Sequence, residues 1–147
     1  MAQLRMNAKD QGLVLRHGDG PNKCDYLGAR EAIIFKENDV YHLFYDGAGT
    51  KACLATSKDL VNWEKKGPVL DFGKDGELDS ATATSPWFYQ EGEYWHMFYV
   101  ASPNATAAPN NIPAFPYYTM KAISLCQNSA GGGGFDRSGV ASNGSMC

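Results

Sequence analysis

Two acidic residues of this 147-residue chain stand out because their spacing repeats. Asp25 and Asp79 lie 54 residues apart, and they stand six residues before Glu31 and Ser85, respectively. A pair of carboxyl groups can supply a general acid and a general base, whereas aspartate is also a frequent turn cap. The spacing alone therefore leaves a catalytic and a structural interpretation open for these two residues.

The other reactive residue types give weaker signals. The four cysteines lie far apart and form no C-x-x-C pair, which argues against a zinc ribbon or a thioredoxin-type site. They are Cys24, Cys53, Cys126 and Cys147. Because a chain of this length with 44% hydrophobic residues can build a core without cross-links, we expect free thiols. The glycine run at 131–134 lacks the Lys and Ser/Thr of a phosphate-binding loop.

The sequence contains an internal repeat, and the elements of this repeat position these residues. Residues 36–47, KENDVYHLFYDG, match residues 90–101, QEGEYWHMFYVA, at an offset of 54. Residues 12–20 match residues 67–76 at an offset of 55 or 56. The matched segments keep the same order along the chain, which indicates a repeated structural unit.

Each repeat is a set of short predicted strands separated by turn residues. The expected strands are 32–35, 40–45, 51–57 and 63–70 in the first repeat, and 86–89, 94–100 and 118–125 in the second. Both faces of 40–45 are apolar or aromatic, which is typical of a sheet packed between two layers. His42 and His96 occupy equivalent places in such strands, which favours packing over metal binding. A repeated four-stranded sheet of this size is typical of a propeller blade, so we predict an all-β partial β-propeller of two antiparallel blades.

The predicted domain boundaries follow from this repeat. We expect residues 1–126 to form the partial propeller, with blade one at about 28–70 and blade two at about 82–126. The second blade lacks a fourth strand, and an orphan strand at 12–16 matches the outermost strand of blade one. Open edges and blade faces predict a homo-oligomer. Residues 127–147 are rich in Gly and Ser, which predicts a flexible tail.

Composition and charge argue against several classes of partner. A net charge of −3 gives no attraction to nucleic acid or to an anionic membrane, so we expect neither as a partner. No run approaches the length of a membrane-spanning helix, and residues 1–10 show no apolar core of a secretion signal. Aromatic residues make up 12% of the chain, which leaves polar-tipped rings available for a ligand site.

Three segments in succession resemble a known enzyme group. AREAIIFKENDVYHLFYDG, LATSKDLVNWEKKGPVL and SPWFYQEGEYWHMFYVAS resemble the five-bladed propeller glycoside hydrolases, family 43 and its relatives in families 32 and 130. The resemblance covers residues 27–125, about two thirds of the chain, and corresponds to the N-terminal two blades. It implies a glycosidase acting on plant-type or fructan-type glycans. Relatives often hold calcium in the central channel, but no oxygen-ligand loop here demands it, so we expect no cofactor.

The resemblance also implies site residues. The family places an Asp at the start of the innermost strand of its first blade, within Arg-Asp-Pro, and the matching residues here are Arg30-Glu31-Ala32. Glu31 is therefore the first candidate catalytic carboxylate, ahead of Asp25 and Asp79. The extra methylene matters, because a misplacement of about an ångström can cost about a hundredfold in rate.

Three further residues are candidates for contact with the sugar. They are Arg30, Trp87 and Phe115, the last in a long loop at 103–116. Glycoside hydrolysis needs two carboxyl groups, and the family's general acid lies on a later blade that this sequence does not contain. Two alternatives therefore stay open: a non-catalytic carbohydrate-binding propeller fragment, and a relative of the glycoside phosphorylases.

Overall fold

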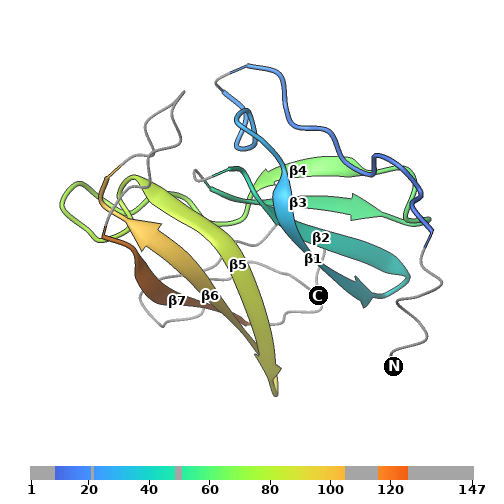
Figure 1. Cartoon of the computed structure of the whole chain (residues 1–147). Helices are drawn as coiled ribbons and strands as arrows, with labels where there is room; N and C mark the ends of the chain where they lie inside the picture. The colour runs from blue at the N-terminus through green and yellow to red at the C-terminus, as the bar shows by residue number, and fades with distance from the viewer. Residues whose placement is uncertain (1–8, 21, 49–50, 105–115, 126–147) are drawn as a thin grey trace.

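The computed structural model describes residues 9–20, 22–48, 51–104 and 116–125, which form two antiparallel sheets and no helix (Figure 1). The first sheet has the order β1-β2-β3-β4, with β1 at Arg30–Glu37, β2 at Val40–Asp46, β3 at Ala52–Ser57 and β4 at Glu64–Pro68. The second has the order β5-β6-β7, with β5 at Thr82–Glu91, β6 at Tyr94–Ser102 and β7 at Tyr118–Leu125. The predicted all-β fold is confirmed.

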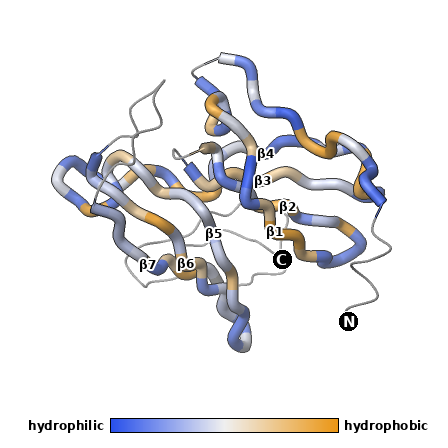
Figure 2. The backbone as a smooth tube through the Cα atoms, viewed as in Figure 1, coloured by the Kyte–Doolittle hydropathy of each residue, from blue (hydrophilic) through white to orange (hydrophobic). Residues whose placement is uncertain are grey.

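Tight turns join the first two strands of each sheet. Glu37 pairs with Val40, which leaves Asn38 and Asp39 as a two-residue loop, and both have a positive φ of 46° and 62°. Such a loop matches the right-handed twist of a hairpin, and Asn and Asp tolerate its left-handed backbone. In Figure 2 this turn and the one between β5 and β6 are hydrophilic, whereas hydrophobic residues concentrate in the strands.

A bulge interrupts the innermost strand of each sheet near its start. The register of β1 shifts between Arg30 and Ile33, and that of β5 shifts between Thr84 and Trp87. A bulge re-aims the side chains next to it. The two bulges are equivalent in the repeat, so both sheets present a redirected side chain at the same place.

The two sheets pack face to face around an aromatic core. Phe35 of the first sheet lies 5.6 Å from Phe88 and 5.2 Å from Trp95 of the second, measured between ring centroids. Phe44 lies 4.3 Å from Phe88 by the same measure. Leu43, Phe44 and Tyr45 are consecutive in β2 and all buried, which confirms that this strand is covered on both faces.

Two features differ from the sequence-based expectation. The seven strands expected within the two repeats form, but β1 begins at Arg30 and β5 at Thr82, earlier than the apolar runs suggested. Residues 12–16 form no strand, because no neighbouring strand within the described part of the chain lies beside them to complete a ladder. The predicted tail at 127–147 lies outside the described residues. No helix in the part that the structure describes could span a membrane.

Candidate functional site

A buried carboxylate joins the starts of the two innermost strands. Asp46 ends β2 opposite Arg30, and its Oδ2 accepts a hydrogen bond of 2.8 Å from Arg30 Nε. Its Oδ1 accepts a hydrogen bond from the Thr84 hydroxyl on β5. The hydrogen bond to Asp46 is the main cause that raises the pKa of Arg30, and the charges of Asp46 and Glu31 act in the same direction. The guanidinium, half-exposed, is thus fixed at the junction of the sheets.

Glu31 lies at this junction and points its carboxylate toward solvent. Its side chain is 54% exposed, Oε2 accepts a 2.7 Å hydrogen bond from Ser85 Oγ, and Oε1 lies 4.0 Å from Arg30 Nε. Glu31 and Ser85 have positive φ values of 53° and 49°, a backbone conformation that is costly for residues other than glycine. The bulge in each innermost strand therefore brings a carboxylate and a hydroxyl together across the two sheets.

An aromatic ring completes this cluster. Tyr117, just before β7, has a side chain that is 43% exposed, and its charge when ionised is the smallest of the effects that raise the pKa of Arg30. Sugar-binding sites commonly combine such rings with a few fixed polar groups. Phe115, the aromatic residue predicted from the sequence, lies outside the described residues.

Asp25 and Asp79 do not join Glu31 but lie buried inside their own repeats. Asp25 Oδ2 accepts a 3.0 Å hydrogen bond from the Tyr45 hydroxyl, and Asp79 Oδ2 accepts one of 2.8 Å from the Tyr99 hydroxyl. The same pair thus recurs in both repeats. Burial, followed by the charge of Asp25, raises the pKa of Tyr45 and keeps it a donor. This placement favours the structural interpretation, and a catalytic role for either aspartate stays a prediction.

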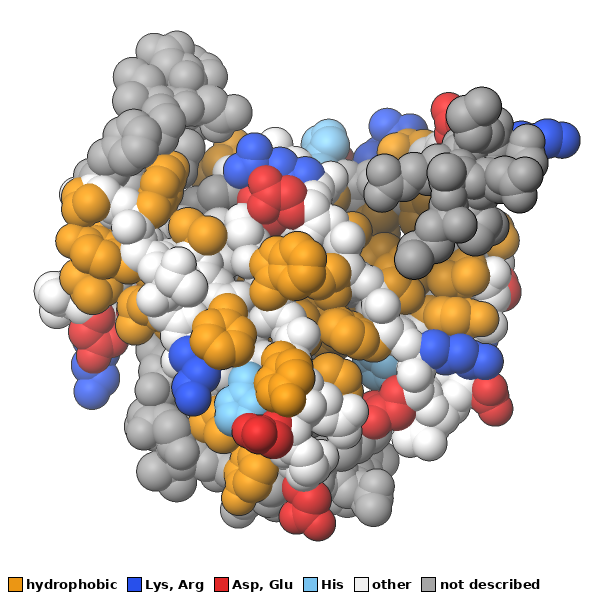
Figure 3. All heavy atoms as spheres, turned by 60° about the horizontal axis from the view of Figure 1, so that its bottom comes forward, with side chains coloured by type: hydrophobic (Ala, Val, Ile, Leu, Met, Phe, Trp, Pro, Cys, Tyr) orange, Lys and Arg blue, Asp and Glu red, His pale blue; other side chains and the backbone are white. Residues whose placement is uncertain are grey.

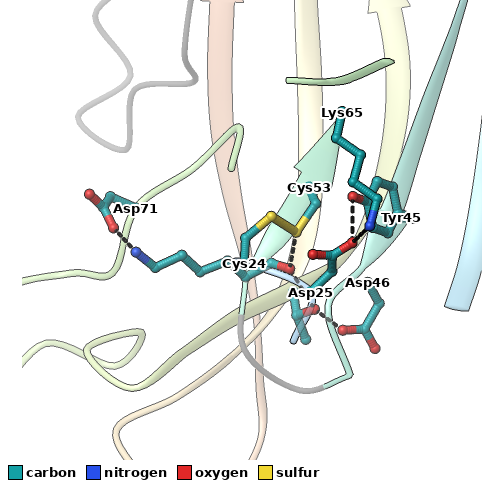
Figure 4. Close-up of a disulfide and its surroundings, with 9 residues drawn as sticks. Cys24, Asp25, Tyr45, Asp46, Cys53, Lys65 and Asp71 are labelled. Atoms are coloured by element: carbon teal, nitrogen blue, oxygen red, sulfur yellow. Dashed lines mark hydrogen bonds and ion pairs between the residues drawn. A yellow bond between two sulfur atoms is a disulfide. The ribbon is translucent and has the colours of Figure 1, made fainter. Parts of the chain in front are cut away.

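The expectation of free thiols is wrong for two of the four cysteines. Cys24 and Cys53 form a disulfide with Cα atoms 6.3 Å apart (Figure 4). Asp25, the neighbour of Cys24, binds Tyr45 on β2 and Lys65 on β4, and its Oδ2 lies 2.5 Å from Lys65 Nζ. Those two strands flank β3, so their contacts with Asp25 bring Cys24 to Cys53. Cys126 and Cys147 lie outside the described residues.

Trp87 lies on the outward face of the second sheet. Its side chain is 69% exposed, and it stands opposite Phe98 in the ladder. The equivalent residue in the first sheet is Ile33, which packs against the core between the sheets. Contact of Trp87 with a glycan stays a prediction. In the described part of the chain, no group of three or more His, Cys, Asp or Glu residues is arranged to hold a metal ion.

Sequence reasoning missed the partners that hold the site together. Asp46 and Thr84 were not candidates, although Asp46 is the one charged residue that directly follows the apolar strand 40–45. A charged residue at the end of a strand that is buried on both faces can be identified from the sequence as a candidate, because an ion placed there requires a partner. Thr84 gives no such signal, since hydroxyl residues are common in strands.

The comparisons with known proteins agree with this fold. No protein-family model matches the sequence. The 1,2-β-oligomannan phosphorylase of Thermoanaerobacter sp. (strain X514) is 42% identical over 58 residues, which are 35% of this chain and 20% of that protein.

Solved structures of the Cellvibrio cellulosa α-L-arabinanase align with a TM-score of 0.52 and cover 78% of this chain and 36% of theirs. The identity is 18% for one of them and 15% for the arabinanase complexed with arabinohexaose. The chain therefore spans about a fifth of the phosphorylase and about a third of the arabinanase. Its two sheets have the fold of part of a β-propeller of the kind found in glycoside hydrolases.

Proposed function

We propose that this chain supplies the substrate-contacting part of a glycan-active propeller enzyme, a glycoside hydrolase, with Glu31 as its reacting carboxylate. The observation that carries the proposal is the exposed Glu31 carboxylate, oriented by Ser85 and placed beside the fixed Arg30 guanidinium. Both named relatives act on glycans according to their names. The substrate class, plant-type or fructan-type glycans, rests on the family resemblance.

Each residue of the cluster has a role in this proposal. In hydrolysis, one carboxyl group protonates the leaving oxygen while the other activates water or attacks the sugar. With Glu31 as base, a water oxygen bonds to the anomeric carbon, the water proton moves to Glu31, and the glycosidic C–O bond breaks. Arg30 and Tyr117 contact sugar hydroxyls, and Asp46 positions Arg30. The proton for the leaving oxygen comes from an acid outside the cluster.

Phosphorolysis is the second candidate, because the 58-residue match is to a phosphorylase. There a phosphate oxygen takes the place of the water oxygen at the anomeric carbon, and the products are a sugar phosphate and the shortened glycan. The Arg30 guanidinium next to Glu31 is a suitable contact for a phosphate dianion. A dependence of turnover on inorganic phosphate, with release of sugar phosphate, would replace the hydrolase proposal by this one.

The test is turnover of aryl glycosides, whose phenolate leaves without the acid that the cluster lacks, by the 147-residue chain with and without phosphate. Glu31→Gln keeps the shape and removes the charge, and we expect kcat to fall at least about a hundredfold with little change in KM. Glu93→Gln, in the exposed turn before β6, is the matched control and should leave kcat unchanged.

Two outcomes would contradict the assignment. Full activity of Glu31→Gln together with an inactive, folded Asp79→Asn would show that the wrong carboxylate was chosen. Binding of oligosaccharides by calorimetry without turnover of any aryl glycoside would favour the non-catalytic carbohydrate-binding fragment.

A further inference from the structure

Residues 9–16 resemble the outermost strand of the first sheet in sequence and at one backbone position, although they form no strand. They match β4 and the residues after it at an offset of 55, so that Gly12 corresponds to Gly67. Gly12 has a φ of 84° and Gly67 a φ of 99°, and Gly67 lies at the irregular step of the ladder between β3 and β4. The N-terminal segment thus shows the left-handed glycine of β4 at the same place, although it forms no ladder within the described residues.

The contacts of this segment with the first sheet resemble the contacts that the residues after β4 make with the second sheet. Gly18 N donates to Asp25 O at 3.3 Å, and Gly73 N donates to Asp79 O at 3.2 Å. Leu15 packs against the cluster that contains Leu43 and Tyr45 of the first sheet. Its counterpart Leu70 is buried in the cluster that contains Met97 and Tyr99 of the second sheet. The N-terminal segment therefore occupies the place of the outer strand of a preceding blade.

The front face of the second sheet lacks, within the described residues, the cover that the front face of the first sheet has. We call front face the side of the first sheet that carries Ile33, Phe35 and Phe44, which pack toward the second sheet. Their equivalents on the second sheet are Trp87, Tyr89 and Phe98, which are 69%, 59% and 42% exposed.

The ladder puts these three rings on one face, because Trp87 stands opposite Phe98 and Tyr89 opposite His96. Figure 3 shows hydrophobic side chains gathered around a histidine near the middle of the face in view. A contiguous apolar patch of this kind marks an interaction surface. The front face of the second sheet is therefore suited to a further sheet, as the front face of the first sheet is to the second.

The rear face of the first sheet carries residues suited to pack on the exposed front face of the second sheet. The front face of the first sheet is covered by Phe88 and Met97, on the rear face of the second sheet. Their equivalents on the rear face of the first sheet are Ile34 and Leu43, and Ile34 remains 49% exposed. One chain thus carries both halves of the same contact at opposite ends. A propeller ring needs about four blades, so the two described sheets cannot close a ring by themselves.

We propose that the chain associates head to tail with a second copy of itself, independently of any action on glycans. The front face of the second sheet packs on the rear face of the next copy's first sheet. The N-terminal segment of that copy adds to the outer edge of β7 as a fourth strand, which the second sheet does not have within the described residues. By equivalence with the β3–β4 ladder, Gly12 stands opposite Lys121 and Leu13 opposite Met120.

The decisive experiment uses one variant for each half of the interface. Trp87→Glu places a charge on the front face and Ile34→Glu places one on the rear face. Sedimentation velocity at micromolar concentration should show the unmodified chain as an assembly and each variant as a 16.0-kDa monomer. An equimolar mixture should form a complex of two copies, because each variant retains the half that the other lacks. Val61→Glu, at a 75% exposed turn position outside both faces, should assemble like the unmodified chain.

A second pair of variants tests the strand itself. Gly12→Val puts a β-branched residue at a left-handed position that has open space around it, and it should weaken the mixed complex at least tenfold. Gly20→Val creates the same backbone strain outside the segment and should not. Circular dichroism of every variant should match that of the unmodified chain.

Three results would overturn the proposal. A monomeric unmodified chain would show that these faces do not bind each other. Failure of the mixture to associate would point to a front-to-front dimer or to another surface. Equal effects of the two glycine variants would exclude strand addition.

Discussion

At the scale of single residues, Asp46 determines the geometry of the candidate site. It accepts hydrogen bonds from Arg30 on its own sheet and from Thr84 on the other, and it is fully buried. Burying a carboxylate is costly unless charged and neutral donors both reach it. The position of Arg30 beside Glu31 is therefore set by a residue that does not itself face the solvent.

Asp46→Asn tests this dependence. Asparagine keeps the volume of aspartate but lacks the charge that Arg30 and Thr84 bind. We therefore expect the free energy of unfolding to fall by about 2 kcal/mol. Asp71→Asn is the control, because the Asp71 side chain is 77% exposed and its ion pair with Lys51 should contribute less than about 1 kcal/mol. Urea unfolding at a fixed protein concentration measures both. Equal effects of the two variants would contradict the role given to Asp46.

A second residue-scale prediction concerns pH. His42 lines a cavity of about 280 Å³ between the sheets with Phe35 and Trp95, and burial lowers its pKa below the usual 6.5, opposed in part by Glu37. Between the folded and the unfolded pKa the unfolded chain binds more protons, so stability falls as the pH drops below about 6.5.

The control for this prediction is the exposed His17. We expect His42→Gln to flatten the loss of stability between pH 7 and pH 5, measured by urea unfolding, and His17→Gln to leave it as steep as in the unmodified chain. An unchanged slope in His42→Gln would show that another group causes the loss.

At the scale of elements, local sequence patterns predicted which segments form strands. Contacts between residues far apart in sequence determine where a strand such as β1 begins. The range 118–125 was predicted as observed for β7, because apolar alternation and turn residues mark it. Local sequence could not show that β1 begins at Arg30, since the pairing of Arg30 with Asp46 crosses a bulge.

The site was predictable to a similar extent. Family resemblance predicted a role for the adjacent residues Arg30 and Glu31, whereas Thr84 and Ser85 come from a second sheet that only tertiary packing places beside them. The same reason explains why the disulfide was missed, because Cys24 reaches Cys53 through contacts of Asp25 with two other strands.

The disulfide gives a prediction at this scale. It ties the segment before β1 to β3 across 29 residues, which in the loop-entropy description stabilises the fold by about 3 kcal/mol. Cys24→Ser with Cys53→Ser should lower the unfolding free energy by about that amount, as should reduction of the unmodified chain. If reduction lowers the unfolding free energy of the double variant as much as that of the unmodified chain, the loss comes from other cysteines and not from this disulfide.

At the scale of the whole molecule, the proposed assembly links stability to concentration. A partner that binds only the folded chain raises the apparent stability as its concentration rises. The thermal midpoint of the unmodified chain should therefore increase between 1 and 100 μM, by about the amount that mass action gives, while that of Trp87→Glu should stay constant. A constant midpoint in both would be at odds with the assembly.

The order of strands in each sheet also has a consequence for how the chain is made. Strands β1 to β4 and β5 to β7 each pair with their neighbours in sequence, so the contacts are local and need little loop closure. The first sheet can thus form on the ribosome before the second has emerged. The N-terminal segment is the exception: it precedes all the described strands, yet in the proposed assembly its partner is β7, the last of them. In the proposed assembly, the N-terminal segment and the outer edge of β7 would then stay unpaired until two copies meet.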